Sequence, residues 1–332
     1  MITAAVLAGL VAGHMFSGLR TVSAQALQAS VTVAAVVRTV SPGAEGAVVV
    51  DLEVTHVPCG HGAAPGPLRI HQLAEHGTAY QPGQRALFPL LPARRSPHRP
   101  ADLPPDAWTV DQAPSEVTWL TEAELAPAVD RLARFCRAPP AARQAVRVEM
   151  LVEGPAGLAR AAALDLALAA EPLQLEGPVE ARLADWLRTR SVPAGLRVAG
   201  LQAVGRAGPG ALRDAAADLL RPWEPPEVVA AALRALGPDD AMARAALPAL
   251  LMGPPGLGRM HAARLAGAAR LEDAVPALGV LAWGPETEAA GTACRALAAV
   301  DSRAARAELE RLRGALPPER ARACARGAVP PK

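Results

Sequence analysis

Leu233-Arg234-Ala235-Leu236-Gly237 belongs to a series of related stretches that recurs through the second half of the chain. Its members share an opening leucine and are spaced 32 residues apart, at Leu201, Leu233, Leu265 and Leu297. A second apolar column follows the same period in the partner segments and consists of Leu219, Leu251 and Trp283. A fixed period of this length, with two short helices in each unit, is typical of an α-solenoid. Each helix pair exposes an apolar face that only its neighbour covers.

The leucine register defines four units from about Pro193 to Arg313. Residues 155–190 resemble a looser earlier unit, and residues 317–327 form a short end helix that suits a cap. We therefore predict an α-solenoid over residues 139–332.

Two stretches near the centre of these units carry a family resemblance. Ala245-Ala246-Leu247-Pro248-Ala249-Leu250 and Asp273-Ala274-Val275-Pro276-Ala277-Leu278 resemble the second helices of HEAT repeats, in particular the short HEAT-like repeats of phycobilisome lyases. The family often places an arginine early in the first helix, and Arg197 matches that position. The later repeats do not keep the arginine and carry Val229, His261 and Ala293 instead. An arginine row at this position is therefore incomplete.

The first half of the chain has the pattern of a β-sheet. Apolar and polar residues alternate over 47–56, which is typical of a half-buried strand. A β-branched run over 30–40 is predicted to pair with it through a turn at 42–46. Further strands are expected over 68–73, 85–91 and 108–110, and a proline-rich insertion over 92–106. A helix is expected to begin after Thr121, with acidic residues in its first turn.

This order of elements resembles the netrin-type, OB-like barrel of tissue inhibitors of metalloproteinases and of bacterial envelope proteins. The resemblance rests on the opening strand pair, the Val57-Pro58-Cys59-Gly60 corner and the Tyr80–Phe88 segment. It covers about Leu27 to Cys136, and the domain is predicted over residues 27–138 with a C-terminal helix. The predicted fold class is thus α+β and multidomain, with a small OB-like β-barrel followed by a HEAT-like α-solenoid.

The composition limits the function. Apolar residues make up 51% of the chain and aromatic residues 3%, which favours helices packed through small side chains. The net charge of +2 is too small to predict nucleic-acid binding by the whole chain. The chain contains one lysine, Lys332, which we interpret with the alanine and proline bias as the mark of a GC-rich genome.

The N-terminus resembles a secretory signal peptide. An apolar run over 4–12 is too short to span a bilayer, and small residues around Ala24 and Ala26 fit a cleavage site. Residues 1–26 are therefore predicted to be a cleaved signal, which implies a periplasmic or secreted protein. No lysine or arginine precedes the apolar run, so a buried N-terminal helix in a cytoplasmic protein is the alternative.

The four cysteines divide evenly between the two halves. This distribution is compatible with one disulfide in each half, Cys59–Cys136 and Cys294–Cys324, and equally with four buried thiols.

Histidines cluster in the first half, at His56, His61, His71, His76 and His98. Together with Cys59 they include ligand types suited to zinc or copper. No Cys-x-x-Cys pair accompanies them, so surface histidines and a disulfide at Cys59 are the alternatives. His71 and His76 are five residues apart, which rules out the two-histidine helix of a metalloprotease. The glycine-rich segment 60–66 lacks a following helix, so it does not predict a phosphate site.

No catalytic residue or cofactor motif is identified. We predict a non-enzymatic protein-binding or scaffold protein of the bacterial cell envelope. Its partner would be a protein that lies on a concave surface built by the second helices, whose charged residues are Arg213, Asp214, Asp218, Arg244, Glu272, Asp273, Arg306 and Glu310. The alternatives are a secreted protease inhibitor acting through the barrel and an enzyme of the HEAT-like lyase class. The N-terminal cysteine that such inhibitors use is absent from both predicted mature starts, Gln25 and Leu27.

Overall fold

The computed structural model describes residues 26, 29–43, 47–73, 80–95, 103, 106–110, 117–168, 173–205 and 210–327. The predicted signal peptide, residues 1–26, lies outside this set except for Ala26. The chain forms two compact units, Met1–Asp165 and Leu166–Lys332, which are described separately below.

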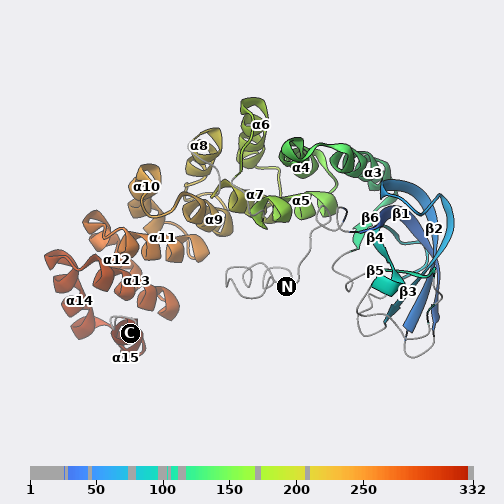
Figure 1. The fold of residues 1–332 in the computed structure, drawn as a ribbon. Helices are drawn as coiled ribbons and strands as arrows, with labels where there is room; N and C mark the ends of the chain where they lie inside the picture. The colour runs from blue at the N-terminus through green and yellow to red at the C-terminus, as the bar shows by residue number, and fades with distance from the viewer. Residues whose placement is uncertain are drawn as a thin grey trace. The chain divides into compact units, whose positions relative to one another are not determined.

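The first unit contains a closed five-stranded barrel (Figure 1). Its strands, with a sixth added at one side, are β1 (Val31–Pro42), β2 (Ala47–Gly60), β3 (Gly66–Leu73), β4 (Arg85–Pro92), β5 (Trp108–Val110) and β6 (Thr118–Leu120). The order around the barrel is β1-β2-β3-β5-β4, and antiparallel pairing of β1 with β4 closes it. β3 and β5 pair in parallel, whereas the other pairs are antiparallel, including β6 on β4.

The barrel core is formed by side chains that point alternately inward and outward along the strands. Side chains at every second position of β1, from Val31 to Val37, point inward with Val50, Leu52 and Val54 of β2. Tyr80, Phe88 and Trp119 complete the core with ring centroids about 6 Å apart. A barrel of this size is filled by side chains and leaves no channel.

The predicted strands over 47–56, 68–73, 85–91 and 108–110 are confirmed. The predicted corner at Val57–Gly60 is wrong, because β2 continues through it and pairs with the start of β1, with irregular register that bends both strands. The strand ends at Gly60, whose φ is +80°. A Cβ there would lie 2.3 Å from the Ser30 carbonyl oxygen, so glycine is required. Sequence reasoning missed the short strand β6.

Helices follow the barrel. They are α3 (Glu122–Arg137), α4 (Arg143–Glu153) and α5 (Ala156–Leu168), whose last residues belong to the second unit. A short 3-10 turn, η5 (Pro140–Ala142), precedes α4, and another, η3 (Ala93–Arg95), follows β4 within the barrel. The expected start of α3 after Thr121 is confirmed: the Glu124 carboxylate accepts hydrogen bonds from the backbone N–H and the hydroxyl of Thr121.

The second unit consists of helices throughout its described part. They are α6 (Gly177–Arg188), α7 (Ala194–Val204), α8 (Ala211–Asp218), α9 (Pro226–Leu236), α10 (Ala241–Leu251), α11 (Leu257–Ala268), η6 (Glu272–Ala274), α12 (Val275–Trp283), α13 (Thr287–Val300), α14 (Arg303–Ala315) and α15 (Pro318–Gly327). They form two rows (Figure 1). In the first row α7, α9, α11, α13 and α15 contact one another in succession, and the second row is α6, α8, α10, α12 and α14. The four register leucines are all buried.

Small residues bring the helices of the first row close together. A Cβ on Gly205 would lie 3.4 Å from the Cα of Ala235, and one on Gly267 would lie 2.8 Å from the Cα of Ala296. Close approach on one side bends the unit toward that side, and in Figure 1 the first row follows the inner side of the bend. The charged residues expected on a concave surface, among them Arg213, belong instead to the outer row and to η6.

Candidate protein-binding surface

The histidines singled out in the sequence do not assemble into a metal site in the described part of the chain. His56 lies on β2, His61 follows it, and His71 lies on β3. Among the described residues no three His, Cys, Asp or Glu side chains are placed to hold a metal ion, and His76 and His98 lie outside that set. Partial burial, and then Arg69, lower the pKa of His71, so this imidazole is neutral at pH 7.

All four cysteines form disulfides. Cys59 at the end of β2 is bonded to Cys136 on α3, and Cys294 on α13 is bonded to Cys324 on α15. The free-thiol alternative is therefore wrong in this structure. Each bond attaches a helix to an element distant in sequence.

Two carboxyl groups whose pKa is lowered, Asp51 and Asp240, have structural partners. Hydrogen bonds from Arg69 and Thr39 lower the pKa of Asp51 on the barrel surface. Burial alone would raise the pKa of Asp240, but hydrogen bonds from the Ala243 amide, Arg213 and the Met242 amide lower it overall. Asp240 thereby caps α10 and holds α8 through Arg213. These carboxylates stabilise the fold and are already occupied.

The loops that join one helix pair to the next carry or directly adjoin four of the seven large exposed apolar side chains in the described part of the chain. These loops follow α8, α10 and α12 and are rich in proline and glycine, as in Arg221-Pro222-Trp223-Glu224-Pro225 and Met252-Gly253-Pro254-Pro255-Gly256. The exposed fractions are 67% for Trp223, 60% for Met252, 53% for Leu257 and 39% for Trp283. We call these four residues the apolar edge. Tryptophan and methionine are enriched at protein interfaces, and exposed clusters of such residues mark contact sites.

Contacts between neighbouring loops hold the apolar edge in place. A Cβ on Gly253 would lie 3.6 Å from the Cβ of Pro222, and one on Gly256 would lie 3.1 Å from the Cβ of Pro226. Trp223 and Met252 each adjoin one of these contacts in the sequence, so they lie on adjacent loops. Trp283 is fixed differently, by the Arg311 guanidinium 5.7 Å from its ring centroid and by hydrogen bonds from Arg320 to the Trp283 and Gly284 carbonyls.

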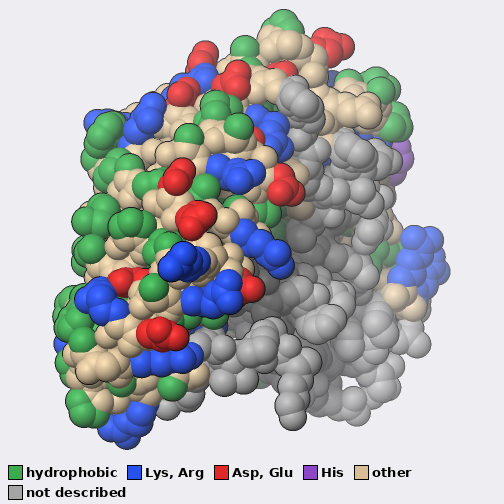
Figure 2. All heavy atoms as spheres, turned by 90° about the vertical axis from the view of Figure 1, so that its left-hand side faces the viewer, with side chains coloured by type: hydrophobic (Ala, Val, Ile, Leu, Met, Phe, Trp, Pro, Cys, Tyr) green, Lys and Arg blue, Asp and Glu red, His purple; other side chains and the backbone are tan. Residues whose placement is uncertain are grey.

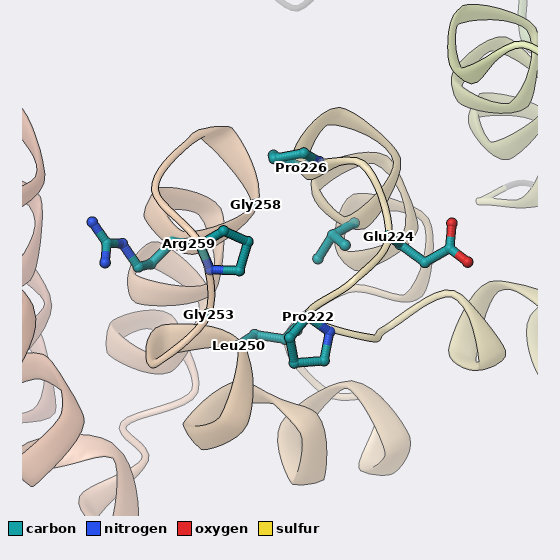
Figure 3. Close-up of a pocket in the computed structure, with 9 residues that line it drawn as sticks. Pro222, Glu224, Pro226, Leu250, Gly253, Gly258 and Arg259 are labelled. Carbon is teal, nitrogen blue, oxygen red and sulfur yellow. The ribbon is translucent and has the colours of Figure 1, made fainter.

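A shallow hollow lies between two of these loops, lined in part by Pro222, Pro226, Leu250 and Pro254 (Figure 3). Its cavity volume is about 10 Å³, far smaller than the roughly 300–1,000 Å³ of typical small-molecule pockets. In Figure 3 the Glu224 carboxylate and the Arg259 guanidinium point in opposite directions, away from the hollow. The hollow therefore lacks converging polar groups among its lining residues and is suited to an apolar contact rather than to chemistry.

Ion pairs with arginines of the first row of helices hold these loops in place. Arg197 on α7 is 2% exposed, and its guanidinium lies 2.9 Å from the carboxylate of Glu224, which is 7% exposed. The Nε of Arg197 also donates to the Leu187 carbonyl at the end of α6. Arg259 and Glu286 form a more exposed pair two helix pairs further on, at 3.6 Å. Arg197, which the family resemblance singled out, is therefore placed to position the Trp223 loop.

The apolar edge was missed in the sequence because Trp223, Met252 and Leu257 do not follow the helical period, and because Trp283, which does, was read as part of the buried column. A usable signal was present, since each loop between pairs combines proline or glycine with a tryptophan, methionine or leucine. Figure 2 views the molecule from the side on which α14 lies and shows acidic and basic side chains interleaved with apolar ones. No helix in the described part of the chain is both long and apolar enough to cross a membrane.

No model of a known protein family matches the chain, and no curated protein shows significant similarity to it. The functional argument therefore depends on the residues and their geometry.

Proposed function

We propose that this chain is a non-enzymatic binding protein of the bacterial cell envelope and that its helical unit docks a protein partner through the apolar edge. The single observation that carries the proposal is the exposure of Trp223, 67%, on a loop fixed by a buried ion pair. A rigid, exposed tryptophan retains little conformational entropy to lose on binding. Such residues supply much of the binding energy at interfaces.

The helical unit is proposed to be a HEAT-like α-solenoid. Three features support this interpretation: the 32-residue leucine register, the two rows of helices, and the burial of every register leucine. The short helix α15 covers α13 at the end of the row, as a capping element would.

The barrel is proposed to be OB-like and related to netrin-type domains. Its closed strand order, β1-β2-β3-β5-β4, supports this interpretation, as does the glycine turn at Gly83 that leads into β4. The disulfide that attaches α3 to β2 adds to it. We assign the barrel no separate activity.

An envelope location is supported by the two disulfides, which persist in oxidising compartments. The apolar run over 4–12 agrees with export. Sequencing the N-terminus of exported protein tests this part: a start near Gln25 or Leu27 supports it, and an intact Met1 contradicts it.

The docking proposal is tested by affinity capture from an envelope fraction with the full-length chain, using the variants Trp223→Ala and Met252→Ala. The matched control is Met242→Ala, because Met242 is also exposed but lies at the opposite end of α10 from Met252. We expect Trp223→Ala to weaken binding of the captured protein by about tenfold or more. The control should retain wild-type binding.

Two results would overturn the proposal. One is that no protein is captured reproducibly. The other is that the captured protein binds the edge variants and the control equally well, because the contact would then not involve the apolar edge.

A further inference from the structure

A row of arginines runs along the exposed face of the first row of helices. Each of three successive helices carries one arginine near its centre or C-terminal half: Arg234 on α9, Arg264 on α11 and Arg295 on α13. All three side chains are exposed, whereas the residues on either side of each in the sequence are buried. We call these three residues the arginine row.

Packing contacts place Arg234 and Arg295 beside close approaches between neighbouring helices of the first row. Gly205 approaches Ala235, which directly follows Arg234, and Gly267 approaches Ala296, which directly follows Arg295. The middle arginine, Arg264, and its neighbour Arg234 both influence His261 of α11. Burial, and then the charges of Arg234 and Arg264, lower the pKa of this imidazole to about 4. The charges of both guanidinium groups therefore act on the same side chain.

The arginine row lacks the carboxylate partners that other arginines of this unit have. Arg188, Arg213, Arg259 and Arg311 form ion pairs with Asp218, Asp240, Glu286 and Glu308. Within the described part of the chain, no ion pair is formed by Arg234, Arg264 or Arg295; Arg295 donates to the Thr292 hydroxyl of its own helix. Partial burial lowers the pKa of Arg234, so this charge is also incompletely hydrated.

We propose that the arginine row binds an extended acidic peptide segment of the partner protein, with a carboxylate at every third residue. This inference rests on the proposed protein-binding function and specifies the chemistry of the partner. Packed helices lie about 8–10 Å apart, and an extended chain advances about 3.3 Å per residue. Carboxylates three residues apart therefore match arginines on neighbouring helices. The planar guanidinium also favours paired hydrogen bonds with a carboxylate.

The surroundings favour a narrow acidic strand over a broad polyanion. Glu227 on α9 and Glu288 on α13 are exposed seven residues before Arg234 and Arg295, on the same helical faces. Seven residues are about two helical turns, or roughly 10 Å along the axis. A nucleic-acid backbone or an anionic membrane covering that width would contact both glutamates, whereas a single peptide strand crossing at the arginines avoids them.

The test uses the full-length protein and a fluorescent peptide with glutamate at every third position, separated by serine and threonine. A peptide with the same composition but its glutamates in one block serves as the spacing control. Arg264→Gln removes the central charge, and Arg244→Gln is the matched control because Arg244 is an exposed arginine of the outer row. We expect Arg264→Gln to weaken binding by at least about tenfold and Arg244→Gln to leave it unchanged.

Four outcomes would overturn the inference. They are no binding of the spaced peptide, equal binding of the block peptide, an equal loss with Arg244→Gln, and tighter binding of single-stranded DNA or of vesicles containing phosphatidylglycerol than of the peptide. The result is separable from that of the docking proposal. Trp223→Ala tests the apolar edge by capture of the partner, and Arg264→Gln tests the arginine row with a defined peptide.

Discussion

The two units use their few aromatic residues in opposite ways. The barrel directs Tyr80, Phe88 and Trp119 into its core and leaves its ion pairs, such as Arg69 with Asp51, on the exposed strands. The helical unit fills its core with alanine, leucine and glycine, buries an arginine–glutamate pair, and exposes Trp223 and Trp283. Among the tryptophans of the helical unit Trp186 packs against Gly200, so the exposed rings of Trp223 and Trp283 indicate a contact surface, whereas the barrel needs rings to fill its interior.

The largest expected effect comes from breaking the buried ion pair between Arg197 and Glu224. Arg197→Ala leaves Glu224 buried with only the exposed Arg190, 3.6 Å away, and should lower the free energy of unfolding of the helical unit by about 3–5 kcal/mol. The counterpart in the barrel, Arg69→Ala, breaks an exposed pair and should cost about 1 kcal/mol or less. Urea unfolding followed by far-ultraviolet circular dichroism measures both. Equal costs would contradict the contrast between the units.

The disulfides provide the next comparison. Replacing Cys294 and Cys324 with serine should cost about 2–4 kcal/mol, because the unfolded chain gains the freedom of the 30-residue segment between them. The barrel bond encloses 77 residues, and the chain-entropy relation makes its removal about 0.8 kcal/mol more costly. Thermal and urea unfolding of the two serine double variants tests this order. A larger cost for the helical bond would show that α15 contributes more than chain entropy.

Close packing of the first row predicts an intermediate effect. Gly267→Ala places a Cβ 2.8 Å from the Cα of Ala296 and should cost about 1–3 kcal/mol as α11 and α13 separate. Gly195→Ala is the matched control, because Gly195 also lies in a helix but has no atom within 4 Å of its Cβ position. The control should stabilise the protein by about 0.5–1 kcal/mol. Stabilisation by both changes would exclude glycine-dependent contact between the helices.

The smallest effect concerns pH. The pKa of His261 is about 4 in the folded protein and about 6.5 in the unfolded chain. The unfolded state therefore takes up a proton first as the pH falls below 6.5, and the stability present at pH 7 is lost progressively toward pH 4. The midpoint of thermal unfolding should fall by about a few degrees between pH 7 and pH 5, and less in His261→Gln. An unchanged pH dependence in that variant would contradict the assignment.

Much of the fold could be predicted from the sequence because its signals are periodic. Alternation over 47–56 identified β2, and the leucine register identified the first row of helices. The corner at 57–60 was misplaced because its proline and glycine suggested a break, whereas pairing with β1 maintains the strand to Gly60. The expected concave charges were assigned to the wrong row because glycine contacts between helices, which set the bend, have no periodic signal.

The candidate surfaces also combine features that the sequence determined with features that only the tertiary structure decided. The sequence by itself determined the strand and helix segments, the register leucines and the even division of cysteines, because each depends on local spacing along the chain. Tertiary structure alone decided that Cys59 meets Cys136, that Glu224 neutralises Arg197, and that Arg234, Arg264 and Arg295 are each exposed between buried neighbours. These relations join residues 27 to 77 positions apart, so they depend on how helices and strands pack rather than on any short pattern.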